Sequence, residues 1–176
     1  MRKNIVIVGY DYALSRRVAV SLAELFDMRF FDMYDMFVFD NLPNTLTDVI
    51  KLNGKEYVDK KMKGIFKSEF EFSNVIFVVD TKIVSVCKDM YEEIKKNNIV
   101  IFLRRDFKLE FYQREHFVFK TEEERDYFTL KIDELFEADQ DIAHNLADMV
   151  LEVDQLTYRQ VKDFVLEDIK GLLKKK

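Results

Sequence analysis

The feature that most constrains this sequence is a regular alternation of short apolar runs with longer amphipathic stretches. The apolar runs predict five strands, at residues 4–9, 28–32, 74–80, 98–103 and 149–153. The amphipathic stretches predict five helices, at residues 14–26, 55–71, 84–96, 121–137 and 157–173. Uninterrupted apolar runs are typical of strands that helices cover on both faces. The alternation therefore predicts a three-layer α/β/α fold with a five-stranded parallel sheet.

Composition narrows the class of protein further. The chain has 176 residues, 48% of them hydrophobic, with only 4 Gly and 1 Pro, which predicts one domain over residues 1–176 without a linker. The net charge of -5 disfavours non-specific binding to nucleic acid. No apolar run approaches the roughly 18 residues of a membrane span, so we expect a cytoplasmic protein that binds no membrane. The single cysteine, Cys87, excludes an internal disulfide.

The turn after the first predicted strand can be compared with the phosphate-binding pattern G-x-x-x-x-G-K-[ST]. In that pattern backbone N–H groups hold phosphates, the lysine reaches the β- and γ-phosphates, and the Ser/Thr binds magnesium. Here only the first glycine is present, as Gly9, and Leu14 takes the place of the second. Ser15 replaces the lysine and supplies no positive charge, while Arg16 replaces the magnesium ligand. An ordinary strand-to-helix turn that never bound phosphate explains these residues equally well.

The same turn contains groups that bear on anion binding. The start of a helix favours anions, and Arg16 and Arg17 lie there, but Asp11 adds a negative charge beside the expected phosphate position. The alternative is that the arginines pair with Asp11 or Glu24 on the surface. The candidate nucleotide- or anion-binding residues are Gly9, Ser15, Arg16 and Arg17.

Three longer segments connect the chain with a known family. They are NIVIVGY, VAVSLAELFDMRFFDMYDMF and LADMVLEVDQLTYRQVKDFVLEDI. They are similar to the first strand, to the first helix with its short strand and Asp-x-Asp motif, and to the last strand and helix of shikimate kinases. Over nearly its full length the sequence resembles this P-loop kinase family. The resemblance implies the strand order 2-3-1-4-5 and a lid-like region at about residues 105–120, whereas a flavodoxin-like domain would have the order 2-1-3-4-5.

The resemblance also implies where functional side chains lie, and most of them are replaced. Asp32 keeps the acid near the magnesium, but Tyr34 replaces the acid that contacts substrate hydroxyls. Asp59 and Gln140 lie near the places of two substrate-binding arginines. A glycine triplet corresponds to residues 79–81, which contain no glycine. The nearest candidate for the lid arginine is Arg114; Tyr34 and Arg114 are therefore the candidate substrate or lid residues.

Two acids at strand ends form a candidate metal site. Asp32 and Asp80 each end a predicted strand, and the carboxyl ends of parallel strands form the ligand-binding edge of such sheets. Two carboxylates there could share a cation. The alternative is that both acids simply begin turns, which is a common role of Asp.

The replaced residues predict a pseudoenzyme: a shikimate-kinase-like fold with a binding, regulatory or structural role, no catalytic residue and no cofactor. Its partner would be a protein or a small anionic ligand. The alternative is a diverged phosphotransferase that uses ATP and magnesium, with Arg16 or Arg17 in place of the lysine. A third possibility is an anion-binding domain with the flavodoxin-like strand order.

Overall fold

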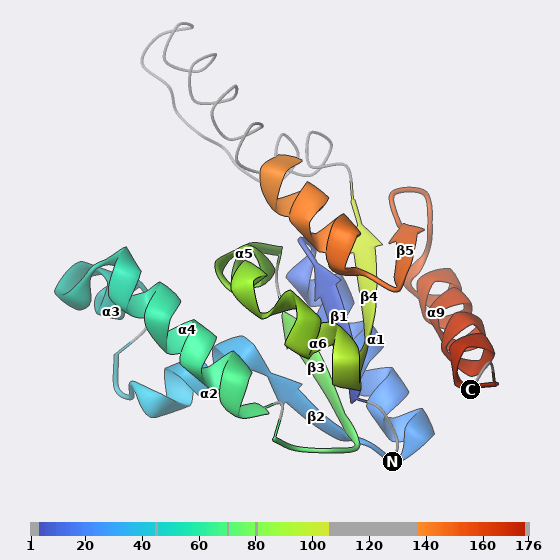
Figure 1. Cartoon of the computed structure of the whole chain (residues 1–176), viewed down its shortest axis with the longest axis horizontal. Helices are drawn as coiled ribbons and strands as arrows, with labels where there is room; N and C mark the ends of the chain where they lie inside the picture. The colour runs from blue at the N-terminus through green and yellow to red at the C-terminus, as the bar shows by residue number, and fades with distance from the viewer. Residues whose placement is uncertain (1–3, 45, 70, 80, 106–136, 175–176) are drawn as a thin grey trace, which may run out of the picture.

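The computed structural model describes residues 4–44, 46–69, 71–79, 81–105 and 137–174. Its five strands form one parallel sheet in the order β2-β3-β1-β4-β5 (Figure 1). This confirms the order 2-3-1-4-5, and the flavodoxin-like alternative is wrong for this chain. The strands are β1 (Asn4–Gly9), β2 (Arg29–Asp32), β3 (Val75–Val79), β4 (Asn98–Arg104) and β5 (Met149–Glu152).

Helices connect the strands on both sides of the sheet. They are α1 (Tyr12–Phe26), α2 (Met33–Asp40), α3 (Leu46–Asn53), α4 (Lys55–Glu69), α5 (Thr81–Val86), α6 (Tyr91–Asn97), α9 (Tyr158–Lys174) and a helix at residues 137–146, with a short 3-10 turn at Lys88–Met90. No helix among these described elements is long and apolar enough to cross a membrane.

Several helices differ from the sequence prediction. Helices α2 and α3 were not predicted. Residues 33–40, which form α2, are mostly apolar and show no clear amphipathic period. The helix expected at residues 84–96 is instead divided into α5, the 3-10 turn and α6. Most of the helix expected at residues 121–137 lies outside the described residues.

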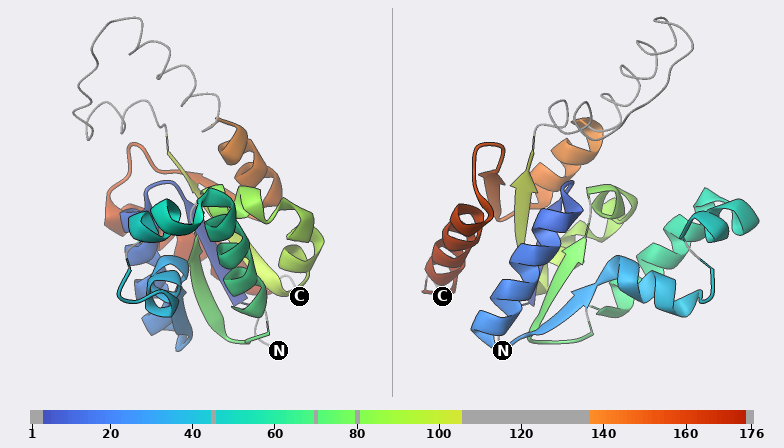
Figure 2. Two further views of the ribbon diagram at one scale, coloured as in Figure 1. Left: turned by 90° about the vertical axis from the view of Figure 1, so that its left-hand side faces the viewer. Right: turned by 180° about the vertical axis from the view of Figure 1, so that it is seen from behind.

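The two faces of the sheet are packed by different sets of helices (Figure 2). On one face, α1 and α9 bury Leu22 and Val165 against alternate residues of the strands, such as Ile7. On the other face, α2, α4, α5, α6 and the helix at residues 137–146 bury the intervening residues, such as Val6 and Phe77. Alternate residues of a strand point to opposite faces, so two apolar layers explain the uninterrupted apolar runs.

The strand register brings two turns to one edge of the sheet. β1 lies between β3 and β4, and Gly9 at the end of β1 is opposite Leu103 of β4. The residues that follow Gly9 therefore lie beside the residues that follow Leu103. This edge, at the carboxyl ends of the strands, is where ligands bind in open α/β sheets.

Candidate functional site

The turn after β1 ends at Asp11, whose side chain caps helix α1. This residue is the N-cap of α1, and its Oδ1 accepts a hydrogen bond of 3.0 Å from the backbone N–H of Leu14. Its backbone carbonyl accepts the first helical bond, from Ser15 N at 2.9 Å. Asp is among the preferred N-caps, which explains why α1 begins at Tyr12 instead of Leu14.

A second partner of Asp11 comes from the end of β4. Arg105 Nη1 donates to Asp11 Oδ2, so the two carboxylate oxygens are divided between a helix N–H and a guanidinium. The Asp11 side chain is only 8% exposed and that of Arg105 is 26% exposed. Arg105 Nε also lies 3.9 Å from Asp154 Oδ1, which follows β5. A negatively charged group of the chain itself thus occupies the start of α1.

Ser15, at the position that the phosphate-binding pattern gives to lysine, is fully buried. Its Oγ has no hydrogen-bond partner among the residues that the structure describes. The hydroxyl lies against Gly9, since a Cβ placed on Gly9 would be only 2.2 Å from it. The first turn of α1 therefore contains a short, neutral side chain where a kinase of this type needs an ammonium group.

Arg16 binds two acids of the neighbouring β2–α2 segment. Its Nε donates to Asp32 Oδ2 at 2.7 Å, and its Nη2 donates to Asp35 Oδ2 at 2.7 Å. These hydrogen bonds, first to Asp32 and then to Asp35, raise the pKa of the Arg16 guanidinium above its ordinary value. The sequence alternative that paired Arg16 with Asp11 or Glu24 is wrong, because its partners are Asp32 and Asp35.

Asp32 is the N-cap of α2, with a side chain that is only 2% exposed. Its carboxylate accepts hydrogen bonds from the backbone N–H groups of Tyr34 (2.9 Å) and Asp35 (3.2 Å). The Tyr12 hydroxyl donates to the same carboxylate, and burial together with this bond raises the pKa of Tyr12. Asp32 thus has a complete set of donors and an arginine as its counterion.

The other predicted site residues lie apart from this cluster or outside the described residues. Arg17 extends toward α9, with its guanidinium carbon 4.2 Å from the ring centre of Tyr158. Tyr34 belongs to the Asp32 cluster, where its ring meets that of Tyr12 edge-on at 5.0 Å. Asp80 and Arg114 lie outside the described residues. Within those residues, no three His, Cys, Asp or Glu side chains are arranged to hold a metal ion.

Gln140, which the resemblance to shikimate kinases placed near a substrate-binding arginine, binds the backbone at the end of β4. Its Nε2 donates to the backbone carbonyl of Arg105 at 2.9 Å, and the residue is buried. The helix at residues 137–146 is thereby joined to the end of β4. The sequence analysis did not identify Arg105. Arg105 lies two residues after Leu103, and Asp11 lies two residues after Gly9. The pairing of Gly9 with Leu103 in the sheet therefore brings Asp11 and Arg105 together, but the sequence alone does not give this register.

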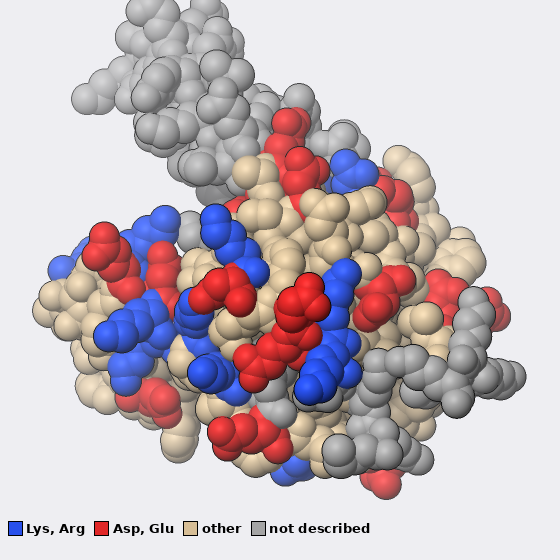
Figure 3. Space-filling view, in the orientation of Figure 1, with Lys and Arg blue, Asp and Glu red and all other residues tan. Residues whose placement is uncertain are grey.

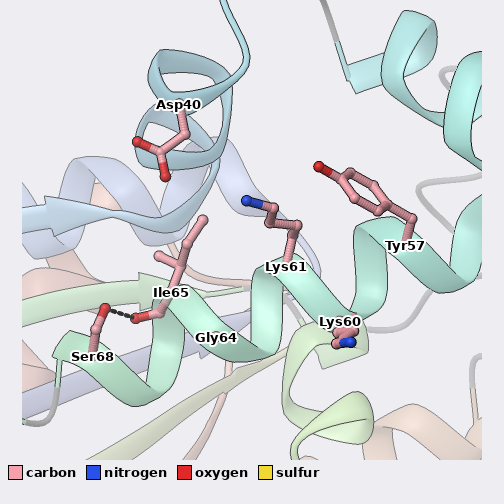
Figure 4. Close-up of a pocket in the computed structure, with 7 residues that line it drawn as sticks. All are labelled: Asp40, Tyr57, Lys60, Lys61, Gly64, Ile65 and Ser68. Atoms are coloured by element: carbon pink, nitrogen blue, oxygen red, sulfur yellow. Dashed lines mark hydrogen bonds between the residues drawn. The ribbon is translucent and has the colours of Figure 1, made fainter.

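A separate groove of about 480 Å³ lies between the end of α2 and one side of α4 (Figure 4). Lys61 of α4 and Asp40 of α2 both extend into it, and Tyr57 stands at its side. Gly64 leaves open space above the helix, since a Cβ there would have no neighbour within 4 Å. The full lining is Asp40, Tyr57, Lys60, Lys61, Gly64, Ile65 and Ser68. None of the residues of the turn after β1 belongs to it.

Charges of both signs are interleaved on the face shown in Figure 3. Lys and Arg side chains alternate there with Asp and Glu side chains over the same helices. Proteins that bind nucleic acid without sequence preference usually present a continuous basic surface. This face does not present one, in line with the net charge of -5.

Comparison with known proteins identifies the fold. No protein-family model and no curated protein matches the sequence. Among solved structures, shikimate kinase from Aquifex aeolicus superimposes with a TM-score of 0.78 and 16% identity over 97% of this chain and 98% of that one. Shikimate kinase from Acinetobacter baumannii, in complex with shikimate, gives 0.76 and 16% over 97% and 94%.

The YorR protein from Bacillus subtilis, in complex with phosphorylated GDP, gives a TM-score of 0.60 and 14% identity over 95% of each chain. The chain therefore has the fold that shikimate kinases share with other P-loop kinases, along nearly its whole length. Likeness at this level of identity establishes the fold, and the activity has to be argued from the site.

Proposed function

We propose that this chain has a P-loop kinase fold without phosphoryl transfer and acts by binding another molecule. The observation that carries the proposal is the position of Arg16, whose guanidinium is bonded to both Asp32 and Asp35. In a P-loop kinase the Ser/Thr at this position and a nearby acid hold magnesium. Here the guanidinium of Arg16 neutralises the carboxylate of Asp32, so neither side chain is available to bind a metal ion.

The missing positive charge supports the same conclusion. Phosphoryl transfer depends almost entirely on positioning and on charges that stabilise the transferred group. Ser15 stands where the lysine should be and is buried without a charge. Loss of one preorganised donor typically lowers a catalytic rate by about 10²–10³, and here the lysine, the magnesium ligand and the second glycine are replaced together.

The alternative of a diverged phosphotransferase requires Arg16 or Arg17 to serve as the missing lysine. Arg16 would have to leave Asp32 and Asp35, and Arg17 would have to leave the ring of Tyr158. Both guanidinium groups contact other side chains in this structure. The geometry therefore favours binding without catalysis.

The groove between α2 and α4 supports a binding role. Its volume of about 480 Å³ falls within the range of small-molecule sites. Lys60 and Lys61 give it two cations against the single carboxylate of Asp40, and Tyr57 supplies an aromatic surface. A small anionic ligand, or an acidic side chain of a protein partner, suits this lining.

The test is a thermal unfolding titration of the full chain with Mg-ATP, using an active P-loop kinase as the assay control. A ligand at 100 times its Kd stabilises a protein by about 2.7 kcal/mol, which for a chain of this size raises Tm by roughly 5–11 °C. We expect no such rise at millimolar Mg-ATP and no ATP hydrolysis. A clear rise, with turnover that Arg16→Ala or Arg17→Ala abolishes, would establish the phosphotransferase instead.

A further inference from the structure

We infer that the groove between α2 and α4 is a self-association surface, which receives residues 39–42 of a second copy of this chain. These residues, called the 39–42 segment below, are the end of α2 and the two residues after it. The inference rests on the proposed function and deepens it, because it names the partner whose acidic side chain enters the groove. Asp40 belongs both to the segment and to the groove lining, so the two lie side by side. A two-fold axis can therefore let each copy give its segment and receive the other.

The 39–42 segment exposes two large apolar side chains to solvent. Phe39 is 76% exposed and Leu42 is 63% exposed. Among the described residues, five of the nine exposed large apolar side chains lie between residues 39 and 57, in or beside α2, α3 and α4, and these helices pack on one another. Apolar residues that gather on one exposed part of a protein mark an interaction site, whereas scattered ones need no explanation.

The charges of the groove suit a second copy better than a purely acidic ligand. Lys61 of α4 and Asp40 of α2 extend into it (Figure 4), and in the described part of the chain neither forms an ion pair. An acidic ligand would pair with Lys61 but would leave Asp40 beside a like charge, which opposes association. In a two-fold dimer, Asp40 of each copy can approach Lys61 of the other, so the same pair forms twice.

A glycine within α4 leaves the groove open. Gly64 lies inside the helix Lys55–Glu69, and a Cβ there would have no neighbour within 4 Å, so packing within the chain does not require glycine. Glycine inside a helix is less stable than alanine. Its advantage is that another backbone can approach it closely. Gly64 therefore suits a surface on which a second molecule packs.

The experiment measures the oligomeric state of the full chain by analytical ultracentrifugation, from about 1 µM to about 1 mM chain, which covers weak and moderate Kd values. We expect a reversible monomer–dimer equilibrium. Asp40→Lys and Lys61→Glu each bring like charges together twice in the dimer, so each should raise the dimer Kd at least tenfold. The combined variant exchanges the two charges and should restore the dimer. Circular dichroism checks that each variant is folded.

A pair of glycine variants separates contact in the dimer from helix stability. Gly171 of α9 is the matched control, because it is also a helix glycine whose Cβ would have no neighbour within 4 Å. Neither Gly64→Gln nor Gly171→Gln should lower the Tm of the monomer, since Gln is the better helix former. Only Gly64→Gln, which fills the groove, should raise the dimer Kd at least tenfold.

Several outcomes would overturn the inference. The unmodified chain might remain a monomer up to about 1 mM, which would leave the groove to an acidic partner of another sequence or to a small anion. A dimer that the single charge variants do not weaken, or that the charge exchange does not restore, would place the contact elsewhere. Equal weakening by Gly171→Gln and Gly64→Gln would do the same. Turnover of Mg-ATP by the unmodified chain would instead contradict the proposed function alone, whatever the oligomeric state.

Discussion

Asp32 and Asp35 offer a comparison of two acids that bind the same arginine from different environments. Asp32 is 2% exposed and caps α2, whereas Asp35 is 66% exposed in the first turn of that helix. Both oxygen-to-nitrogen distances to Arg16 are 2.7 Å. The structure therefore predicts that Asp32→Ala destabilises the chain far more than Asp35→Ala, although each substitution removes one ion pair of equal length.

The magnitude for Asp32→Ala follows from the groups that lose a partner. Loss of the N-cap costs about 1 kcal/mol, and the half-buried Tyr12 hydroxyl, left without its acceptor, costs about 1–3 kcal/mol. The ion pair with Arg16, which is 46% exposed, adds at most about 1 kcal/mol after solvent screening. We therefore expect a loss of about 3 kcal/mol in the free energy of unfolding for Asp32→Ala, against about 1 kcal/mol or less for Asp35→Ala.

The assay is urea unfolding followed by circular dichroism, with Tm as a second readout. For a chain of this length a loss of about 3 kcal/mol lowers Tm by roughly 6–12 °C. Asp32→Asn serves as a further control, because Asn retains the cap but not the charge and should lie between the two alanine variants. Equal losses for Asp32→Ala and Asp35→Ala would refute the reasoning, since burial and capping would then contribute nothing.

Two further predictions concern the interior. Burial raises the pKa of the Cys87 thiol from 9.0 to about 12, so we expect no reaction with a thiol reagent at pH 8 until the chain unfolds. Rapid labelling of the folded chain would contradict this. Because the thiol of the unfolded chain ionises at a lower pH than that of the folded chain, the free energy of unfolding should fall as the pH rises from 9.0 to about 12, and it should fall less steeply in Cys87→Ala. Gly9→Ala should cost about 1–3 kcal/mol by overpacking against Ser15 Oγ, and Ser15→Ala in the same chain should restore most of it in urea unfolding.

The central sheet follows from local sequence. Runs such as residues 5–8 and 99–103 are apolar at every position, which is typical of a strand covered on both faces. The helices on either side are amphipathic for the same reason. The strand order, by contrast, was predicted from the likeness to shikimate kinases, because apolar runs carry no information about which strand lies beside which.

The candidate site was predicted less completely. The sequence placed Gly9, Ser15 and Arg16 in the turn after the first strand and noted the charge of Asp11. In the structure Gly9 ends β1 and Asp11 caps α1, whereas Ser15 and Arg16 already belong to α1. The partners of these residues were not predicted. Arg16 binds Asp32 because the end of β2 lies beside the first turns of α1 in the folded chain. Asp11 binds Arg105 because β1 and β4 are neighbouring strands with Gly9 opposite Leu103.

The sequence by itself determined the five strands and the helices α1, α4 and α9, the loss of the lysine and of the second glycine, and the charge that Asp11 adds to the turn. These are properties of single residues and of their spacing along the chain. Only the tertiary structure decided that Asp11 is held by Arg105 and that Arg16 is held by Asp32. Such pairs join residues far apart in sequence, so they exist only after the sheet has set its order and register.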